Sequence, residues 1–147
     1  MTITREQITE TLQNGWGIYA AHFHQLSPQA QAAELSRQGY ARFPDLLAHV
    51  LGWWERALAE IPLMLADPAY RAPDVDVDTF NVRAVAALRD FDEPAVQRSF
   101  DDTRQALIDL VAGLPAPAFE DERIAWRLDI EVIGHLKEHE LSNHTAI

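Results

Sequence analysis

The sequence predicts an all-α protein folded as a four-helix bundle. Four long segments repeat apolar residues at spacings of three and four, which is the period of an amphipathic helix. No segment alternates apolar and polar residues between hairpin turns, so the sequence gives no indication of a strand. A chain of 147 residues suits one hydrophobic core, and we therefore expect a single domain over residues 1–147.

The first long helix is predicted to begin after Thr4, which has the spacing of a capping box with Gln7. Gly15 and Gly17 flank Trp16 and should weaken this helix, since a helical glycine costs about 1 kcal/mol relative to alanine. Either a neighbouring helix approaches closely there, or a ligand occupies the space beside Trp16; we favour close packing. The apolar stripe of this helix is Ile8, Leu12, Trp16, Tyr19, Phe23 and Leu26.

A short helix over residues 28–37 should lead to the second long helix, which begins near Pro44. That helix should end near Pro62 or soon after, because proline removes a helical hydrogen bond. Apolar residues cover most of its circumference, so neighbours should cover it on more than one side, and we expect a homodimer. These residues are Leu46, Leu47, Val50, Leu51, Trp54, Leu58 and Ile61.

The second half of the chain is predicted to hold two more long helices. Residues 66–78 are rich in Pro and Asp and indicate a surface loop, followed by a short helix over 79–89. The third long helix opens at Asp92-Glu93-Pro94 and ends near Gly113. The fourth is expected from about Ala125 to about Leu141, after the stiff connection Pro115-Ala116-Pro117.

Composition excludes several classes of function. The chain has no cysteine, so disulfides, thiolate metal sites and cysteine nucleophiles are excluded, and nitrogen and oxygen atoms must hold any metal. The net charge is −11 and the 12 basic residues are scattered, so we expect no nucleic-acid partner. No run is apolar enough to span a membrane and the N-terminus lacks a signal-peptide pattern. We therefore expect a cytoplasmic protein without a membrane partner.

Two histidines, His135 and His139, stand four residues apart in the predicted fourth helix. Residues at i and i+4 lie on one helical face, here the face that also carries Leu128, Val132 and Leu136. Neutral imidazole is the commonest protein ligand for a transition metal, so the pair is a candidate metal site. The alternative is a pair of partly buried histidines that hydrogen-bond within the bundle or favour the helix C-terminus.

His49, in the second helix, is the candidate third metal ligand. It lies beside the main apolar stripe, on the flank shared with Trp53 and Ala57, a position that suits either a groove between helices or the surface. Three histidines leave a metal ion with an open position, which is typical of a catalytic rather than a structural site. His22 and His24 are expected at the surface.

The sequence around His49 reads Leu-Leu-Ala-His-Val-Leu-Gly-Trp-Trp, and the sequence around His135 and His139 reads Gly-His-Leu-Lys-Glu-His. These two motifs resemble the DinB/YfiT-like metalloenzyme superfamily. The stretch Asp-Thr-Phe-Asn-Val-Arg-Ala-Val before a helix opening with Glu-Pro is also similar to members of that superfamily. The resemblance implies a four-helix bundle, often dimeric, with a divalent metal such as zinc or nickel on His49, His135 and His139. It also implies a thiol-dependent S-transferase or isomerase acting on small electrophiles with a low-molecular-weight thiol such as mycothiol or bacillithiol.

Three functions are therefore compared. The first is a metal-dependent transferase or hydrolase with a small-molecule substrate, in which Glu55, Glu131 or Glu138 could orient a ligand imidazole. The second is a non-catalytic small-molecule binding or stress-protection protein resembling the ClbS branch of the same superfamily. Its ligand pocket would be lined by Trp16, Trp53 and Trp54. The third is a structural bundle without a ligand, which would use an exposed apolar face to oligomerise.

Overall fold

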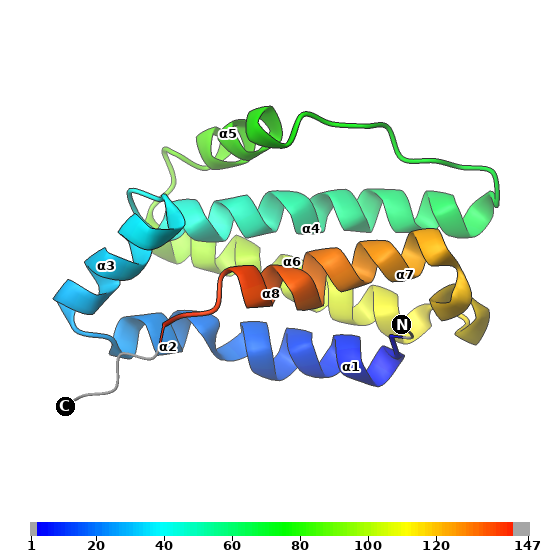
Figure 1. The fold of residues 1–147 in the computed structure, drawn as a ribbon, viewed down its shortest axis with the longest axis horizontal. Helices are drawn as coiled ribbons and strands as arrows, with labels where there is room; N and C mark the ends of the chain where they lie inside the picture. The colour runs from blue at the N-terminus through cyan, green and yellow to red at the C-terminus, as the bar shows by residue number, and fades with distance from the viewer. Residues whose placement is uncertain (1–2, 143–147) are drawn as a thin grey trace.

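The protein is all-helical in its computed structural model, which describes residues 3–142. No strand occurs in that range, so the all-α prediction is confirmed. Figure 1 shows long helical segments lying side by side, with α4 (Phe43–Ala66) and α6 (Glu93–Gly113) packed against each other. None of the described helices is both long enough and apolar enough to cross a lipid bilayer.

The N-terminal helical segment is continuous but irregular. It consists of α1 (Arg5–Glu10), a π-helical turn η1 (Thr11–Gly15), a 3₁₀ turn η2 (Trp16–Ile18) and α2 (Tyr19–Gln25). The predicted capping box is present, because the Gln7 amide donates to the Thr4 hydroxyl at 3.1 Å and the Thr4 amide donates to the Gln7 side chain at 2.9 Å. A Cβ on Gly15 would lie 2.5 Å from Leu136 Cδ2, so the missing side chain serves close packing against the C-terminal segment.

Helix α3 (Pro28–Gln38) joins this segment to α4. Ser27 caps its start, and Gly39 ends it with a φ of 85°, a left-handed conformation that glycine adopts without steric cost. Helix α4 continues four residues beyond Pro62. Pro62 lies on an exposed face and costs the helix one hydrogen bond, while Ile61 and Met64 on the buried face keep the helix packed.

Helix α5 (Val77–Ala87) lies along the outer side of α4, as Figure 1 shows, and none of its residues is fully buried. Aromatic, hydrogen-bond and close backbone contacts attach it to α4. The Phe80 ring packs on Trp53 at 4.1 Å between centroids, the Trp53 indole donates to Asn81 at 2.7 Å, and Ala84 lies against Gly52. Because α5, α6 and α7 all pack on α4, much of its apolar circumference is covered within one chain, and the homodimer stays a prediction.

The C-terminal helical segment follows a 3₁₀ turn, η3 (Ala116–Glu120), and runs through α7 (Glu122–Leu128), the π-helical η4 (Asp129–Gly134) and α8 (His135–Glu138). It begins three residues earlier than predicted, because the Asp121 side chain accepts from the Arg123 amide at 3.0 Å and so acts as its N-cap. It also ends earlier, at Glu138, with His139 as the C-cap residue.

Two tryptophans from other elements fasten the π-helical turn. The Trp16 indole donates to the Val132 carbonyl at 2.9 Å, and the Trp54 indole donates to the Glu131 carbonyl, also at 2.9 Å. The two indoles meet edge to face at 5.2 Å, and Phe100 from α6 packs on Trp54 at 4.9 Å. This aromatic cluster, defined by Trp16, Trp54 and Phe100, is fully buried in the core, and the Trp16 ring contacts that of His135 with centroids 6.0 Å apart.

Replacing Gly52 by alanine should loosen α5. The new Cβ would lie 2.7 Å from Ala84 Cβ, and α5 has no fully buried residue that could hold it in place against this repulsion. Hydrogen exchange followed by mass spectrometry should show faster exchange of the amides in residues 77–87, while those of α6 keep their parent rates.

Gly113→Ala is the matched control. A Cβ at Gly113 meets no atom within 4 Å, so this change should leave α5 exchange unaltered and stabilise the protein by up to about 1 kcal/mol. Unchanged exchange of α5 in the Gly52→Ala variant would contradict the close-contact account.

Candidate metal centre

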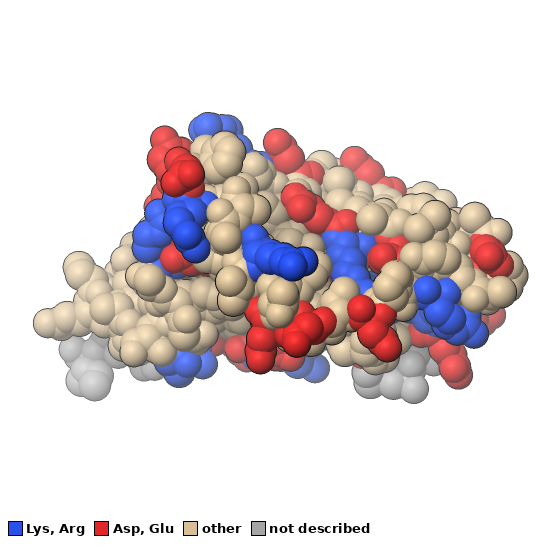
Figure 2. Space-filling view, turned by 90° about the horizontal axis from the view of Figure 1, so that it is seen from above, with Lys and Arg blue, Asp and Glu red and all other residues tan. Residues whose placement is uncertain are grey.

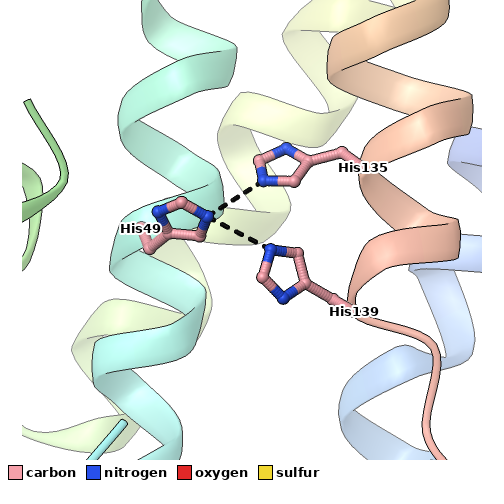
Figure 3. A group of neighbouring side chains, drawn as sticks. All are labelled: His49, His135 and His139. Carbon is pink, nitrogen blue, oxygen red and sulfur yellow. Dashed lines mark hydrogen bonds between the residues drawn. The ribbon is translucent and has the colours of Figure 1, made fainter. Parts of the chain in front are cut away.

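Three buried histidines from two distant parts of the chain meet between α4 and α8. Figure 3 shows the His49 ring reaching from α4 toward His135 and His139, which extend from the C-terminal segment. The His49 Nε2 atom lies 3.0 Å from His135 Nε2 and 3.1 Å from His139 Nε2. All three side chains are buried, with exposed fractions of 6%, 5% and 8% respectively.

Gln38 fixes the tautomer of one of these histidines. The Gln38 amide nitrogen donates to the His139 carbonyl at 3.3 Å, which leaves the amide oxygen to accept from His139 Nδ1 at 2.7 Å. His139 Nδ1 therefore carries the proton, and Nε2 presents a lone pair to the other two rings. An oxygen acceptor on the outer nitrogen is the arrangement that orients a metal-ligating histidine.

Burial keeps the three imidazoles neutral. It lowers the pKa of His49 to about 4, with the Asn81 side chain offsetting part of the effect. Burial and, to a smaller extent, the neighbouring histidines lower the pKa of His135 to about 3 and that of His139 to about 4. The rings are therefore available as neutral nitrogen donors at neutral pH and above.

The geometry of the three nitrogens fits a shared cation. One imidazole nitrogen carries at most one proton, so His49 Nε2 cannot make a straight hydrogen bond to both neighbours. Nitrogens that each lie about 2.05 Å from one zinc ion at tetrahedral angles are about 3.3 Å apart. The observed separations of 3.0 and 3.1 Å are close to that value, and all three nitrogens lie within 4.8 Å of one another. The three histidines can therefore hold a metal ion.

Residues of α2 and α3 hold the His139 end of the cluster in place. The Tyr19 hydroxyl donates to the His139 carbonyl, which also accepts from Gln38. Glu34, which is 1% exposed, accepts from Arg37 and from the Ser142 amide and so ties the chain after His139 to α3. Neither Gln38 nor Glu34 belongs to a motif that points to a site, because only the docking of α3 against the end of α8 brings them to His139.

A pocket of about 650 Å³ opens beside the cluster, and His49 and His135 form part of its wall. Of the three tryptophans predicted to line a ligand pocket, the structure places Trp53 along this wall. Trp16 and Trp54 are 1% and 0% exposed and lie in the aromatic cluster of the core. The remaining wall comes from further residues of α4, from residues 71–75, from α5 and from the C-terminal segment.

The three glutamates considered as orienting groups occupy different places. Glu131 is buried and lines the pocket, and burial raises the pKa of its carboxyl to about 7. Glu138 is exposed at the pocket wall, whereas Glu55 is exposed and does not line it. Within residues 3–142, no carboxylate hydrogen-bonds any of the three imidazoles, whereas the Gln38 side-chain oxygen accepts from His139.

The other histidines lie apart from the centre. His22 and His24 are exposed, as predicted, and His24 pairs with Glu93 at 3.4 Å. His144 lies outside the described residues. Within the described range, His49, His135 and His139 form the one group of three or more His, Asp or Glu side chains that lie close enough together to hold a metal ion.

Comparisons with known proteins return no match: no protein family, no curated protein and no solved structure is similar to this chain.

The metal-free protein should lose stability as the pH falls from about 6.5 toward 4. In the unfolded chain the three histidines become protonated near pH 6.5, whereas in the folded chain they stay neutral down to about pH 4. Between these values each histidine can lower the free energy of unfolding by up to about 1.4 kcal/mol per pH unit. Glu131 acts in the opposite direction between its ordinary pKa and about 7, because the folded state keeps its proton, so the net loss is smaller. Urea unfolding with chelator at pH 7.5, 6 and 5 measures the slope.

Two variants check the source of that slope. His49→Gln should flatten the pH dependence, because one buried imidazole no longer titrates on unfolding. His22→Gln should leave it as in the parent, since His22 is exposed. Equal slopes in His49→Gln and the parent would contradict the assignment.

Proposed function

We propose that the protein is a divalent-metal-dependent enzyme with zinc or nickel on His49, His135 and His139, built on a four-helix bundle of the DinB/YfiT-like type. The reaction proposed is either transfer of a low-molecular-weight thiol to a small electrophile or thiol-dependent isomerisation of that electrophile. The observation that carries this proposal is the convergence of three buried Nε2 atoms beside a pocket large enough for a small molecule, with His49 and His135 forming part of its wall.

The roles of the residues follow from their positions. His49, His135 and His139 would hold the ion, and Gln38 keeps the His139 ring in the ligating tautomer. His49 and His135 also form the pocket wall, so the open coordination position would face the space where a substrate binds. When bound, the metal would lower the pKa of a coordinated thiol or water and so supply a nucleophile near neutral pH.

Glu131 is the pocket residue best suited to move a proton. Its carboxyl is buried, its Oε2 atom has no hydrogen-bond partner within residues 3–142, and its raised pKa of about 7 allows both protonation states near neutrality. It would take up or return the proton that a thiol releases on coordination.

A second candidate function is non-catalytic binding of a small molecule, as in the ClbS-like branch. The observation that favours it is the pocket itself, where Trp53, Trp126 and Ile130 offer apolar surface. Turnover separates the two functions: an enzyme should consume an electrophile together with a thiol only when metal is bound, whereas a binding protein should retain the molecule unchanged.

Removing any one of the three histidines should abolish stoichiometric metal binding, because two imidazoles alone make a weak site. Elemental analysis of protein purified without a histidine tag should give close to one metal ion per chain in the parent and far less in His49→Ala, His135→Ala and His139→Ala. A chelator should lower the melting temperature of the parent and leave that of His135→Ala nearly unchanged, since an ion bound only to the folded state stabilises it.

The control is His22→Ala, which removes an exposed histidine and should keep the metal. Loss of metal from His22→Ala to the same extent as from His49→Ala would show that the assigned site is wrong. The same conclusion would follow if the chelator shifted parent and His135→Ala alike.

Gln38→Ala should weaken metal binding by about 10- to 100-fold without removing a ligand, because His139 would lose the acceptor that fixes its tautomer. Competition with a chelating indicator dye measures the affinity. Gln31→Ala on the same helix is a suitable control, because Gln31 donates to the Leu26 carbonyl and does not touch the cluster. Equal metal affinities for Gln38→Ala and the parent would argue against the orienting role.

A further inference from the structure

The pocket beside the histidines contains a buried arginine without a hydrogen-bond partner. Arg127 in α7 lines the pocket, is 6% exposed and donates no hydrogen bond to any residue of the described range. Its guanidinium carbon lies 5.3 Å from the centre of the Trp126 ring. Its Nε atom is buried and has no partner, which is costly for a protein, so this unpaired donor in a pocket indicates a ligand that completes it.

The other arginines of the pocket are already engaged in holding the chain. Arg123 donates to the carbonyls of Met64, Asp67 and Tyr70 and pairs with Asp121 at 2.6 Å. Arg56 donates to the Pro73 carbonyl, and Arg71 donates to those of Pro68 and Tyr70. Arg127 differs from these three because it donates no hydrogen bond within the described residues, and the buried carboxyl of Glu131 interacts with it only electrostatically.

The charges facing this pocket differ from those of the whole chain. The chain carries a net charge of −11, yet the pocket wall holds four arginines against three acidic residues: Asp74, Glu131 and Glu138. Figure 2 views the molecule from the side of α5 and residues 67–76, and shows blue basic groups in the middle of this face with red acidic groups around them. Such local positive charge favours an anion over a cation.

The rim of the pocket is apolar. Val75, Val77, Trp126 and Ile130 line it and are 38%, 55%, 56% and 41% exposed, so large apolar side chains remain open to solvent at its mouth. Apolar side chains around a convergent polar group are typical of small-molecule sites. A ligand that covers this rim would have an apolar body.

We propose that the pocket takes a small molecule with an apolar body and a carboxylate, and that Arg127 holds the carboxylate. A guanidinium binds a carboxylate through two parallel hydrogen bonds, which would satisfy the donors that Arg127 leaves unused. This inference names the substrate class of the proposed metal centre and in that sense rests on the proposed function. The two can nevertheless fail separately, because Arg127 would hold the carboxylate whether or not the histidines hold a metal.

Calorimetric titration with 2-naphthoate and its neutral counterpart 2-naphthamide tests the proposal. The full chain should be used both after chelator treatment and after metal loading. The parent should bind the naphthoate at least tenfold more tightly than the naphthamide in both states. Arg127→Gln should lose this preference while binding the amide as before, and Arg127→Lys should keep part of it, because lysine retains the charge but not the paired donors.

Two further variants are matched controls. Arg83→Gln removes an exposed arginine on α5 that does not line the pocket, and it should keep the parent's preference. Glu131→Gln removes the buried acidic group that interacts with Arg127 and should tighten binding of the naphthoate. If Arg127→Gln fails to fold by circular dichroism, Arg127→Lys and Glu131→Gln still decide the matter through their opposite effects.

Several results would overturn the proposal. They are weak or absent binding of the naphthoate by the parent, equal binding of the two probes, or an unchanged preference in Arg127→Gln. A preference that appears only in the metal-loaded protein would also overturn it, because the anion would then be held by the metal. A protein that binds no metal but still prefers the carboxylate would disprove the proposed function and leave the role of Arg127 intact.

Discussion

The attachment of the π-helical turn η4 to the core is the constraint on which the candidate site depends. Trp16 and Trp54 donate to two successive carbonyls of this turn, at Val132 and Glu131, and both indoles are almost fully buried. Each such bond adds only about 1 kcal/mol to stability, but losing a donor would leave a buried carbonyl unpaired, which costs more. Because His135 directly follows η4, these two bonds fix its position along the helix axis and direct its side chain toward His49 on α4.

The histidine cluster that forms the candidate site lowers the stability of the fold. Three imidazole nitrogens crowd together within a buried space, and the Nδ1 atoms of His49 and His135 have no hydrogen-bond partner in the described part of the chain. Buried polar atoms without partners lower stability, and native proteins hold few of them. The aromatic cluster beneath and α3 beside the site supply the packing that keeps these rings together. Unpaired polar groups concentrated at one place are what a ligand site requires and what a purely structural core avoids.

The polar groups on both sides of η4 belong to one helical surface. Arg127, Glu131 and His135 follow one another at intervals of four residues, so they lie on the same face of the C-terminal segment and all line the pocket. A cation, a carboxyl of raised pKa and a candidate metal ligand therefore stand in a row along one wall. Residues 71–75 and α5 contribute mainly apolar side chains to the rest of the pocket, together with Arg71, Asp74 and Asn81. The result is a binding surface in which each part has a distinct chemical character.

The sequence alone determined the all-helical class and identified the three histidines as candidate metal ligands. Apolar spacing marked each long helix because one face of every helix must be buried, and the i, i+4 spacing of His135 and His139 fixed their common side before any folding. Helix ends were predicted within a few residues, and the differences came from caps such as Asp121 and from packing that carries α4 past Pro62. Tertiary structure alone decided the roles of the tryptophans. Trp53 and Trp54 are neighbours in the chain, yet one lines the pocket and the other fills the core, because adjacent helical residues point about 100° apart. Gln38 and Arg127 carried no local signal either: the partner of the first and the unused donors of the second exist only once distant helices have packed together.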